Sequence, residues 1–371
     1  MKIIAFYLPQ FHVIPENSEW WGEDFTDWVN VRKARPLFED HYQPRIPKDD
    51  NYYNLTDTET LRWQSKLAGE YGIYAFCFYH YWFNGKLLLE KPVELYRDDK
   101  ACQTKYCLCW VNQDWTDQWR SDSPRILIRE RYGGEEEWVK HFEYFLPYFR
   151  DERYIIEDGK PFLVLYEPSD IQDLDKMVEC WRKLAVRNGF AGITIAAQNS
   201  RGRLNGDVLP PSVDFQIDYQ PQYAYSLMKQ TSFPLLRRFK RELQTFLRRH
   251  FGSSVIDGIG KDRRLGIYDY DEIWNKILQI RPQNDQCIPG AFVGWDNTPR
   301  KGSRGFVIKG ADPDKFEKYM NEQIQRAHNV YHKDKIFLFA WNEWAEGGYL
   351  EPDERYGYAY LEAVKRAQEK K

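Results

Sequence analysis

This sequence has almost no excess of one charge over the other, few cysteines and no long apolar run. The 371 residues include 53 basic and 56 acidic side chains, for a formal net charge of -3. A chain so nearly neutral offers no electrostatic reason to expect a nucleic-acid partner. No stretch approaches the ~20 consecutive apolar residues of a membrane span. Cys107 and Cys109 have no second Cys or His cluster near them in the sequence, so neither a metal site nor a cofactor is expected.

Aromatic side chains, by contrast, are abundant. The chain has 14 Trp, 26 Tyr and 22 Phe, or 17% of its residues. Most of them are expected in the core, but the surplus of Trp and Tyr also suits carbohydrate ligands, because these rings join a flat apolar face to a polar edge. Residues 1–9 lack a full apolar signal sequence and resemble a first strand, so a reducing, cytoplasmic setting is expected.

Short apolar runs alternate with helical patterns along the whole chain. Helical spacing of apolar residues is clear in 59–72, 171–188 and 313–331. Strands of about five residues that are apolar on both faces, with helices between them, favour a parallel sheet. Eight such runs, without a Gly-rich phosphate motif after the first, predict an α/β fold of the (β/α)8 TIM-barrel type over an open nucleotide-binding sheet. We expect one catalytic domain over residues 1–371 with loop insertions. The predicted strands are 3–8, 73–79, 106–110, 162–166, 193–197, 213–217, 290–294 and 336–340.

Polar and aromatic residues follow nearly every one of these runs. In a barrel the carboxyl ends of the strands meet at one rim, where the chemistry occurs. Some of these side chains have an equally good role in the core: Tyr7 and His80 as satisfied core residues, Trp110 and Trp115 as a cap on the barrel. The candidate ligand contacts are Tyr7, His80, Tyr81, Trp82, Trp110, Asn112, Trp115, Tyr166, Trp295, Asp296, Asn297, Trp341, Asn342 and Trp344.

The eighth run ends in two carboxylates between two indoles. Glu343 and Glu346 lie three residues apart, a spacing that can project both side chains to the same side of a turn. Two close carboxylates repel each other, which raises one pKa and lets that acid donate a proton near neutral pH. Paired acids beside stacking rings are typical of a site that cleaves glycosidic bonds. The alternative is a Trp-rich strand end with two solvated glutamates.

The connection after the sixth run is strongly basic. Residues 226–266 contain ten Lys or Arg against three acidic residues, with leucines and phenylalanines at helical spacing. An exposed amphipathic insertion explains this pattern. The functional alternative is attachment to an anionic membrane surface, which would bring the protein to the inner membrane face.

Eight motifs run in order along most of the chain: IAFYLPQFH (4–12), WWG (20–22), FTDW (25–28), HYQP (41–44), FCFYHYWFNGK (76–86), GWDNTPR (294–300), WNEWAE (341–346) and LEPD (350–353). Together these motifs resemble the WbsX family and, more distantly, glycoside hydrolase family ninety-nine, the endo-α-mannosidases. One departure lies after the third strand, where this chain has Asn112, Gln113, Asp114 and Trp115 in place of Asn-Glu-Asn-Trp, so the carboxylate and amide positions are exchanged.

The resemblance implies a (β/α)8 barrel that acts on glycans with retention of configuration. It maps the catalytic acids of the hydrolases onto Glu343, as the base toward the sugar 2-hydroxyl, and Glu346, as the general acid and base. The expected partner is a glycan substrate. The first alternative is a glycosyltransferase of bacterial surface-polysaccharide biosynthesis, the activity by which WbsX proteins are described. A glycan-binding module on an inactive barrel is the second.

Overall fold

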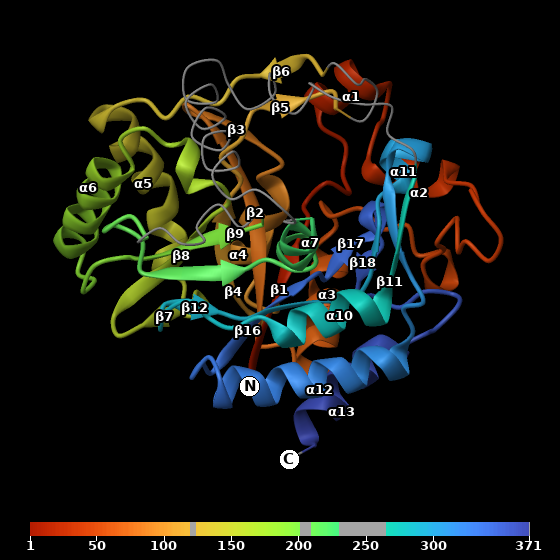
Figure 1. The fold of residues 1–371 in the computed structure, drawn as a ribbon. Coiled ribbons are helices and arrows are strands. Elements are labelled where there is room, and N and C mark those ends of the chain that lie inside the picture. Colours follow the sequence, from red (N-terminus) through yellow and green to blue (C-terminus); the bar gives the residue numbers. More distant parts are fainter. Residues whose placement is uncertain (119–123, 201–208, 230–264, 371) are drawn as a thin grey trace.

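The computed structural model describes residues 1–118, 124–200, 209–229 and 265–370. Its centre is a nearly closed barrel of parallel strands in the order β12-β10-β9-β8-β4-β2-β1-β16-β13 (Figure 1). The prediction of a TIM-type barrel is therefore confirmed. The barrel strands are β1 (Lys2–Tyr7), β2 (Ala75–Phe83), β4 (Lys105–Trp110), β8 (Lys160–Leu165), β9 (Thr194–Asn199), β10 (Phe215–Asp218), β12 (Cys287–Ile288), β13 (Gly290–Phe292) and β16 (Lys335–Phe339).

The seventh predicted strand is divided between two partners. Its first part, β12, pairs with β10, and its second part, β13, pairs with β16. The change of partner falls at Pro289, which has no backbone N–H to give to either neighbour. At Gly290 the chain passes so close to β10 that an added Cβ would lie 1.9 Å from the carbonyl oxygen of Asp218. The division at Pro289 and the absent side chain at Gly290 bring the two ends of the sheet together.

Helices cover the outside of the barrel, and the three helices predicted from periodicity are present. α6 buries Leu174, Met177, Val178, Trp181 and Ala185, which recur at helical spacing on one face. Figure 1 shows α5 and α6 on one flank, and α12 and α13 together near both termini. The main helices are α3 (Thr58–Glu70), α4 (Lys91–Asp98), α5 (Glu135–Phe149), α6 (Leu174–Arg187), α10 (Tyr270–Gln279), α12 (Pro313–Asn329) and α13 (Ala359–Glu369).

Shorter elements decorate the barrel, and several of them follow the carboxyl ends of the strands. They are α1 (Pro15–Trp21), α2 (Asp27–Lys33), β3 (Lys86–Leu88), β5 (Trp115–Thr116), β6 (Ile126–Ile128), β7 (Ile156–Glu157), α7 (Gln222–Met228), β11 (Gly266–Asp269), β14 (Trp295–Asp296), α11 (Thr298–Lys301), β15 (Phe306–Lys309), β17 (Asn342–Glu343) and β18 (Gly348–Tyr349).

The basic insertion predicted over 226–266 lies mostly outside the described residues, which omit 230–264. Its role at a membrane surface, and with it the expected cytoplasmic location, stay predictions. Within the described parts of the chain, none of the helices combines the length and the apolar character needed to cross a membrane.

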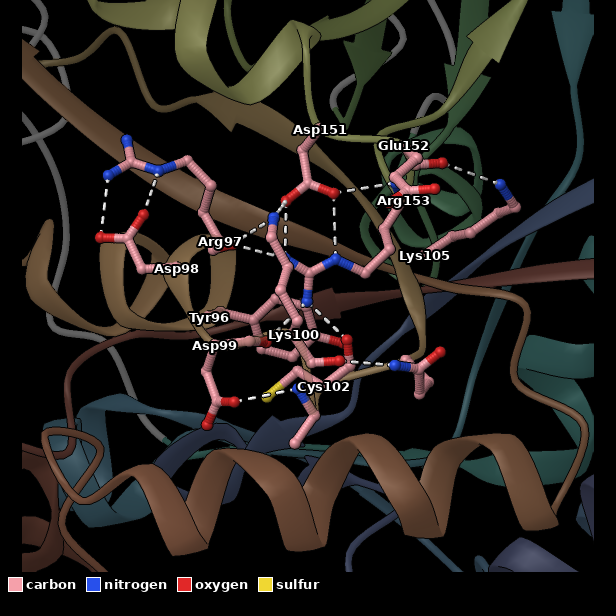
Figure 2. Close-up of polar contacts among 12 residues, drawn as sticks. Tyr96, Arg97, Asp98, Asp99, Lys100, Cys102, Lys105, Asp151, Glu152 and Arg153 are labelled. Atoms are coloured by element: carbon pink, nitrogen blue, oxygen red, sulfur yellow. Dashed lines mark hydrogen bonds and ion pairs between the residues drawn. The ribbon is translucent and has the colours of Figure 1, made fainter.

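A buried arginine ties together two loops at the amino ends of β4 and β8. Arg153 Nε and Nη2 donate to the two carboxylate oxygens of Asp151, at 3.0 and 2.6 Å. Nη1 donates to the carbonyl oxygens of Asp99 and Cys102, and Nη2 donates to that of Arg97 (Figure 2). Every guanidinium nitrogen is thus used within the protein, and this rim of the barrel is stabilised by a saturated network.

We expect Arg153→Lys to destabilise the fold without altering the opposite rim. Lysine keeps the charge but cannot reproduce the planar set of donors, so buried carbonyls lose their partners. The loss should be about 3 kcal/mol in the free energy of unfolding, measured by urea denaturation. Arg187→Gln, an exposed change at the end of α6, is the control and should change stability by less than about 0.5 kcal/mol.

Candidate active site

A pocket opens where the carboxyl ends of the barrel strands meet. Its lining combines acids, amides and aromatic rings, contributed by the end of β2 and by segments that follow β1, β4, β8, β10, β14 and β16. Among the described residues, no three His, Cys, Asp or Glu side chains converge closely enough to hold a metal ion. The lining residues are Leu8, Gln10, Tyr79, Tyr81, Val111, Gln113, Asp114, Trp115, Thr116, Gln118, Tyr166, Tyr219, Arg300, Glu343 and Glu346.

The two glutamates are presented by a tight hairpin. After β16 the chain forms β17, a single 3-10 turn (Trp344–Glu346) and β18, which pairs back on β17. Glu343 is the residue just before this turn and Glu346 is its last residue. The hairpin brings both glutamates to the lining of the same pocket, as their spacing predicts.

Two glycines make this hairpin possible. Gly347 has a φ of +65°, in the left-handed region, and an added Cβ would lie 2.9 Å from Asp296. At Gly348 a Cβ would lie 2.1 Å from the ring of Phe339. Any larger residue would push the hairpin off β16 and displace both acids.

One guanidinium joins both glutamates to a third carboxylate. Arg300 Nη1 donates to Glu346 at 2.7 Å, and Nη2 lies 3.4 Å from Glu343. Arg300 Nη2 also donates to Asp27 at 2.5 Å. The Asp27 side chain is fully buried, whereas that of Glu346 is 20% exposed. The group is thus anchored on the Asp27 side and open to the pocket on the Glu346 side.

Burial dominates the protonation of Glu343. The pKa of this carboxyl is raised to about 8, mainly by removal from water; Arg300 opposes this shift, and the neighbouring Glu346 and Asp27 add to it. A single guanidinium does not balance three carboxylates, so Glu343 keeps its proton near neutral pH. Two acids in one pocket thus have different environments, the arrangement that separates acid and base roles.

A further buried acid supports the hairpin from beneath. Glu351 accepts hydrogen bonds from the Trp344 indole at 2.7 Å, from Tyr53 at 2.7 Å and from Gln64 at 2.6 Å. Burial raises the pKa of Glu351 to about 7, against these donors. The carboxyl holds Trp344, which lies in the turn between the two pocket glutamates.

Five of the residues predicted from the sequence line this pocket: Tyr81, Trp115, Tyr166, Glu343 and Glu346. Trp115 lies against the Tyr81 ring, with a centroid separation of 5.0 Å, and against Trp20, at 6.0 Å. These three rings form one aromatic wall that is partly open to solvent.

The predicted contacts on the eighth and first strands lie below the pocket. Tyr7 is buried and donates its hydroxyl hydrogen to Gln64. Asn342 bonds the backbone of Leu8 through both ends of its amide. Trp341 is buried against Phe76, and Trp344 is stacked on Tyr349. These side chains position the hairpin and do not line the pocket.

Four predicted contacts on the second and third strands also lie away from the pocket lining. His80 and His141 share a hydrogen bond of 2.9 Å between their Nε2 atoms, and burial lowers the pKa of His80 to about 3. Trp82 and Trp110 pack against the His141 ring. Asn112 bonds the backbone of Glu167 on the neighbouring strand end.

The predicted contacts after the seventh strand fix the wall behind the hairpin. Trp295 is buried between Phe306 and Phe339. Asp296 is buried and accepts hydrogen bonds from His41, Gln43 and Thr298. Asn297 accepts a hydrogen bond from the backbone N–H of Phe306.

Several residues of the pocket, and the buried Asp27 that anchors Arg300, were not selected from the sequence. Arg300 and Asp27 each lie inside a quoted motif, GWDNTPR and FTDW, and a charged residue within such a motif is a signal that could have found them. Gln10, Asp114 and Tyr219 lie within four residues after the ends of predicted strands. Their position at strand ends was visible, but the sequence does not show which of these side chains face inward.

Comparison with known proteins now defines the relationship. The sequence model of the family described as Glycosyltransferase WbsX matches residues 3–364. This chain belongs to that family. Two proteins called WxcX, described as uncharacterized, from Xanthomonas campestris pv. campestris strains B100 and ATCC 33913, are each 33% identical over 98% of the chain. The chain spans about half the length of these curated relatives, since the matches cover 49% of each.

Solved structures share the fold at low sequence identity. The GH99 endo-alpha-mannosidase from Bacteroides thetaiotaomicron is 13% identical, with a TM-score of 0.55 over 99% of this chain and 96% of that one. A structure described as a glycoside hydrolase-like protein is also 13% identical, with a TM-score of 0.57 over 99% of this chain and 93% of that one. The WbsX and GH99 resemblance read from the motifs is confirmed, as far as family and fold.

We expect Glu343→Gln to remove a pH-dependent loss of stability. The folded-state pKa of Glu343, about 8, lies above the ordinary value, so the folded protein holds a proton that the unfolded chain has released. The stability from this group is complete below the ordinary pKa and is lost as the pH rises toward about 8. The Tm of the variant should therefore exceed that of the parent more at pH 8 than at about pH 5.

Glu369→Gln, an exposed change on α13, is the control for this comparison and should leave the pH dependence unaltered. Asp218 and Glu351, whose pKa values burial raises to about 7, weaken both proteins alike over the same range. An equal decline in Tm for the parent and Glu343→Gln would contradict the raised pKa.

Proposed function

We propose that this protein is a carbohydrate-active enzyme that cleaves or transfers glycosidic bonds. The observation that carries the proposal is the pair Glu343 and Glu346, both in contact with Arg300 in a pocket at the carboxyl-end rim of a barrel. This is the rim where enzymes with this fold carry out their chemistry. Membership of the WbsX family and the GH99-like fold support the same substrate class.

The pocket lining suits an uncharged polyol. The rings of Tyr81, Trp115 and Tyr166 offer flat faces for the C–H surfaces of a sugar. The amides of Gln10 and Gln113 offer both donors and acceptors for its hydroxyls. A glycan would therefore bind through stacking on one side and hydrogen bonds on the other, with the glycosidic oxygen directed toward the two acids.

In the proposed reaction the glutamates take the roles implied by the family resemblance. Ionised Glu343 removes the proton of the sugar 2-hydroxyl, and that oxygen attacks the anomeric carbon as the bond to the leaving oxygen breaks. Glu346 gives its proton to the leaving oxygen. Glu346 then takes a proton from water or from an acceptor hydroxyl, whose oxygen opens the anhydro ring, and Glu343 returns a proton to the 2-oxygen. Two displacements at one carbon retain its configuration.

The environment of Glu343 suits a base of this kind. A sugar hydroxyl is a weak acid, and a carboxylate with a raised pKa takes a proton from it more readily than one with an ordinary pKa. Arg300 steadies the ionised form, because it lies 3.4 Å from Glu343 and is itself anchored by Asp27. The same guanidinium orients Glu346, so it holds both acids in position.

The description of the family as a glycosyltransferase favours a second candidate function. In that case the anomeric carbon is delivered on a nucleotide or another activated carrier, and the acceptor is a growing polysaccharide. Calorimetry with common nucleotide sugars distinguishes the two candidates. Binding that is weakened by Trp115→Ala would favour the transferase, and flat titrations would favour cleavage or transfer between glycans.

We expect Glu343→Gln and Glu346→Gln each to lower kcat by about 100-fold or more, because each removes a proton-transfer group. Initial rates on a panel of defined oligosaccharides, with product analysis, measure the effect. Glu369→Gln is the matched control and should keep full activity, since it lies on α13 away from the pocket. Activity close to that of the parent in either pocket variant would refute its assigned role.

The pH dependence of kcat/KM tests which glutamate is the base. If Glu343 acts as the base, kcat/KM should fall by about tenfold for each pH unit below pH 8, because the carboxylate is lost to protonation. If Glu343 were instead the acid, the fall would occur above pH 8. An aryl glycoside with a good leaving group provides the second readout and should restore activity to Glu346→Gln but not to Glu343→Gln.

A further inference from the structure

A second cavity lies behind the catalytic hairpin. It has a volume of about 350 Å3 and is enclosed by residues 38–45, by the end of β15 and by residues 347–360. It shares Gly347 and Asp296 with the wall of the hairpin but none of the side chains that line the catalytic pocket. The cavity is therefore separate in its lining from the catalytic pocket, and it meets the hairpin at Gly347 and Tyr349.

The cavity contains an arginine that the protein uses only in part. Arg45 Nη1 donates to the carbonyl oxygen of Gly347 at 3.3 Å, and Nη2 lies 4.0 Å from Asp296, beyond hydrogen-bond distance. Its Nε is buried without a hydrogen-bond partner among the described residues. Arg153, in contrast, has every guanidinium nitrogen bonded to the protein (Figure 2). A purely structural role therefore leaves much of the Arg45 donor capacity unexplained.

Asp296 forms only a long ion pair with this guanidinium, 4.0 Å from Arg45 Nη2 and without a hydrogen bond. His41 Nδ1 accepts the N–H of Leu37, so its Nε2 carries the hydrogen that it donates to Asp296 at 2.8 Å. Gln43 and Thr298 donate to the same carboxylate. Asp296 is thus satisfied by neighbours other than Arg45, whose side chain is 18% exposed.

Tyrosine rings and a second arginine surround Arg45. Its guanidinium carbon lies 5.5 Å from the ring centres of Tyr42 and Tyr349. Arg355 lies 4.7 Å from the ring centre of Tyr42 and 5.2 Å from that of Tyr356. The hydroxyls of Tyr42 and Tyr349 are directed to Asp353. The Tyr349 ring is buried and stacked on Trp344, so the accessible ring surfaces of the cavity belong to Tyr42 and Tyr356, which are partly exposed.

We propose that this cavity is a second binding site, for a sugar unit that carries an anionic oxygen group, either a carboxylate or a phosphate. Planar guanidinium groups match such oxygens in geometry and charge, and tyrosine rings supply stacking surfaces for the sugar. Glu39 and Asp40, two further acids of the lining, are exposed, so solvent and salt screen their repulsion. The site would hold an acidic unit of a glycan close to the catalytic hairpin.

The second site contacts the hairpin that carries Glu343 and Glu346. An added Cβ at Gly347 would lie 2.9 Å from Arg45 Nη2, so the guanidinium packs directly on the residue that follows Glu346. A ligand that orders Arg45 would also restrain that turn. The binding itself is independent of the proposed reaction, and it is tested without measuring turnover.

Calorimetric titration with glucuronate, glucose 6-phosphate and glucose tests the proposal. Glucuronate or glucose 6-phosphate, or both, should bind more tightly than neutral glucose, and the stronger of the two identifies the source of the anionic group. Arg45→Gln and Arg355→Gln should each weaken that binding by about tenfold, the value of one charge-assisted interaction. Arg187→Gln is the charge-matched control and should bind as the parent does.

Three results would overturn the proposal: no binding of either anionic sugar, equal binding of glucose, or unchanged binding in both arginine variants. Arg355 is exposed, so Arg355→Gln keeps the test decisive even if Arg45→Gln fails to fold. Circular dichroism and thermal melting of each variant establish the folded state before titration.

Discussion

The candidate site depends on one buried cation among three carboxylates. Arg300 contacts Asp27, Glu343 and Glu346, and a single positive charge does not compensate three negative ones in a space with little water. The imbalance is relieved by a proton on Glu343, whose pKa burial raises to about 8. Because Asp27 is fully buried and Glu346 is partly exposed, the cluster is anchored in the protein on one side and open to the pocket on the other.

The position of this cluster depends on close contacts between backbone segments of the barrel and the hairpin. Gly290 lets the divided seventh strand pass the end of β10 and complete the barrel. Gly347 and Gly348 let the hairpin lie against Asp296 and Phe339. Glu351 then holds Trp344 from below through its indole N–H. Barrel closure and the position of the hairpin, and with it the two acids, thus all depend on close backbone packing at glycines, where a Cβ would not fit.

Much of this arrangement could be predicted from the residues. The apolar runs and helical periods indicate the barrel, and the three-residue spacing of Glu343 and Glu346 indicates a shared direction. The supporting residues were harder. Trp341, His80 and Tyr7 look like ligand contacts because they follow or end apolar strands, yet each is buried and packed or bonded inside the protein. Side chains at a strand end point alternately into the pocket and into the surrounding protein. The local sequence does not show which direction a residue takes when the residues on either side of it are aromatic as well.

The strand and helix order, the family and the pair of acids at the end of the last barrel strand can all be read from the residues, because they follow from local periodicity and from contiguous motifs. The contact between Asp27 and Arg300, which are 273 positions apart and anchor that pair, is visible only in the folded chain. The same holds for Arg45, which meets the hairpin 302 positions away. Both contacts depend on where the loops lie over the closed barrel, and packing between segments that are far apart in the chain sets that position.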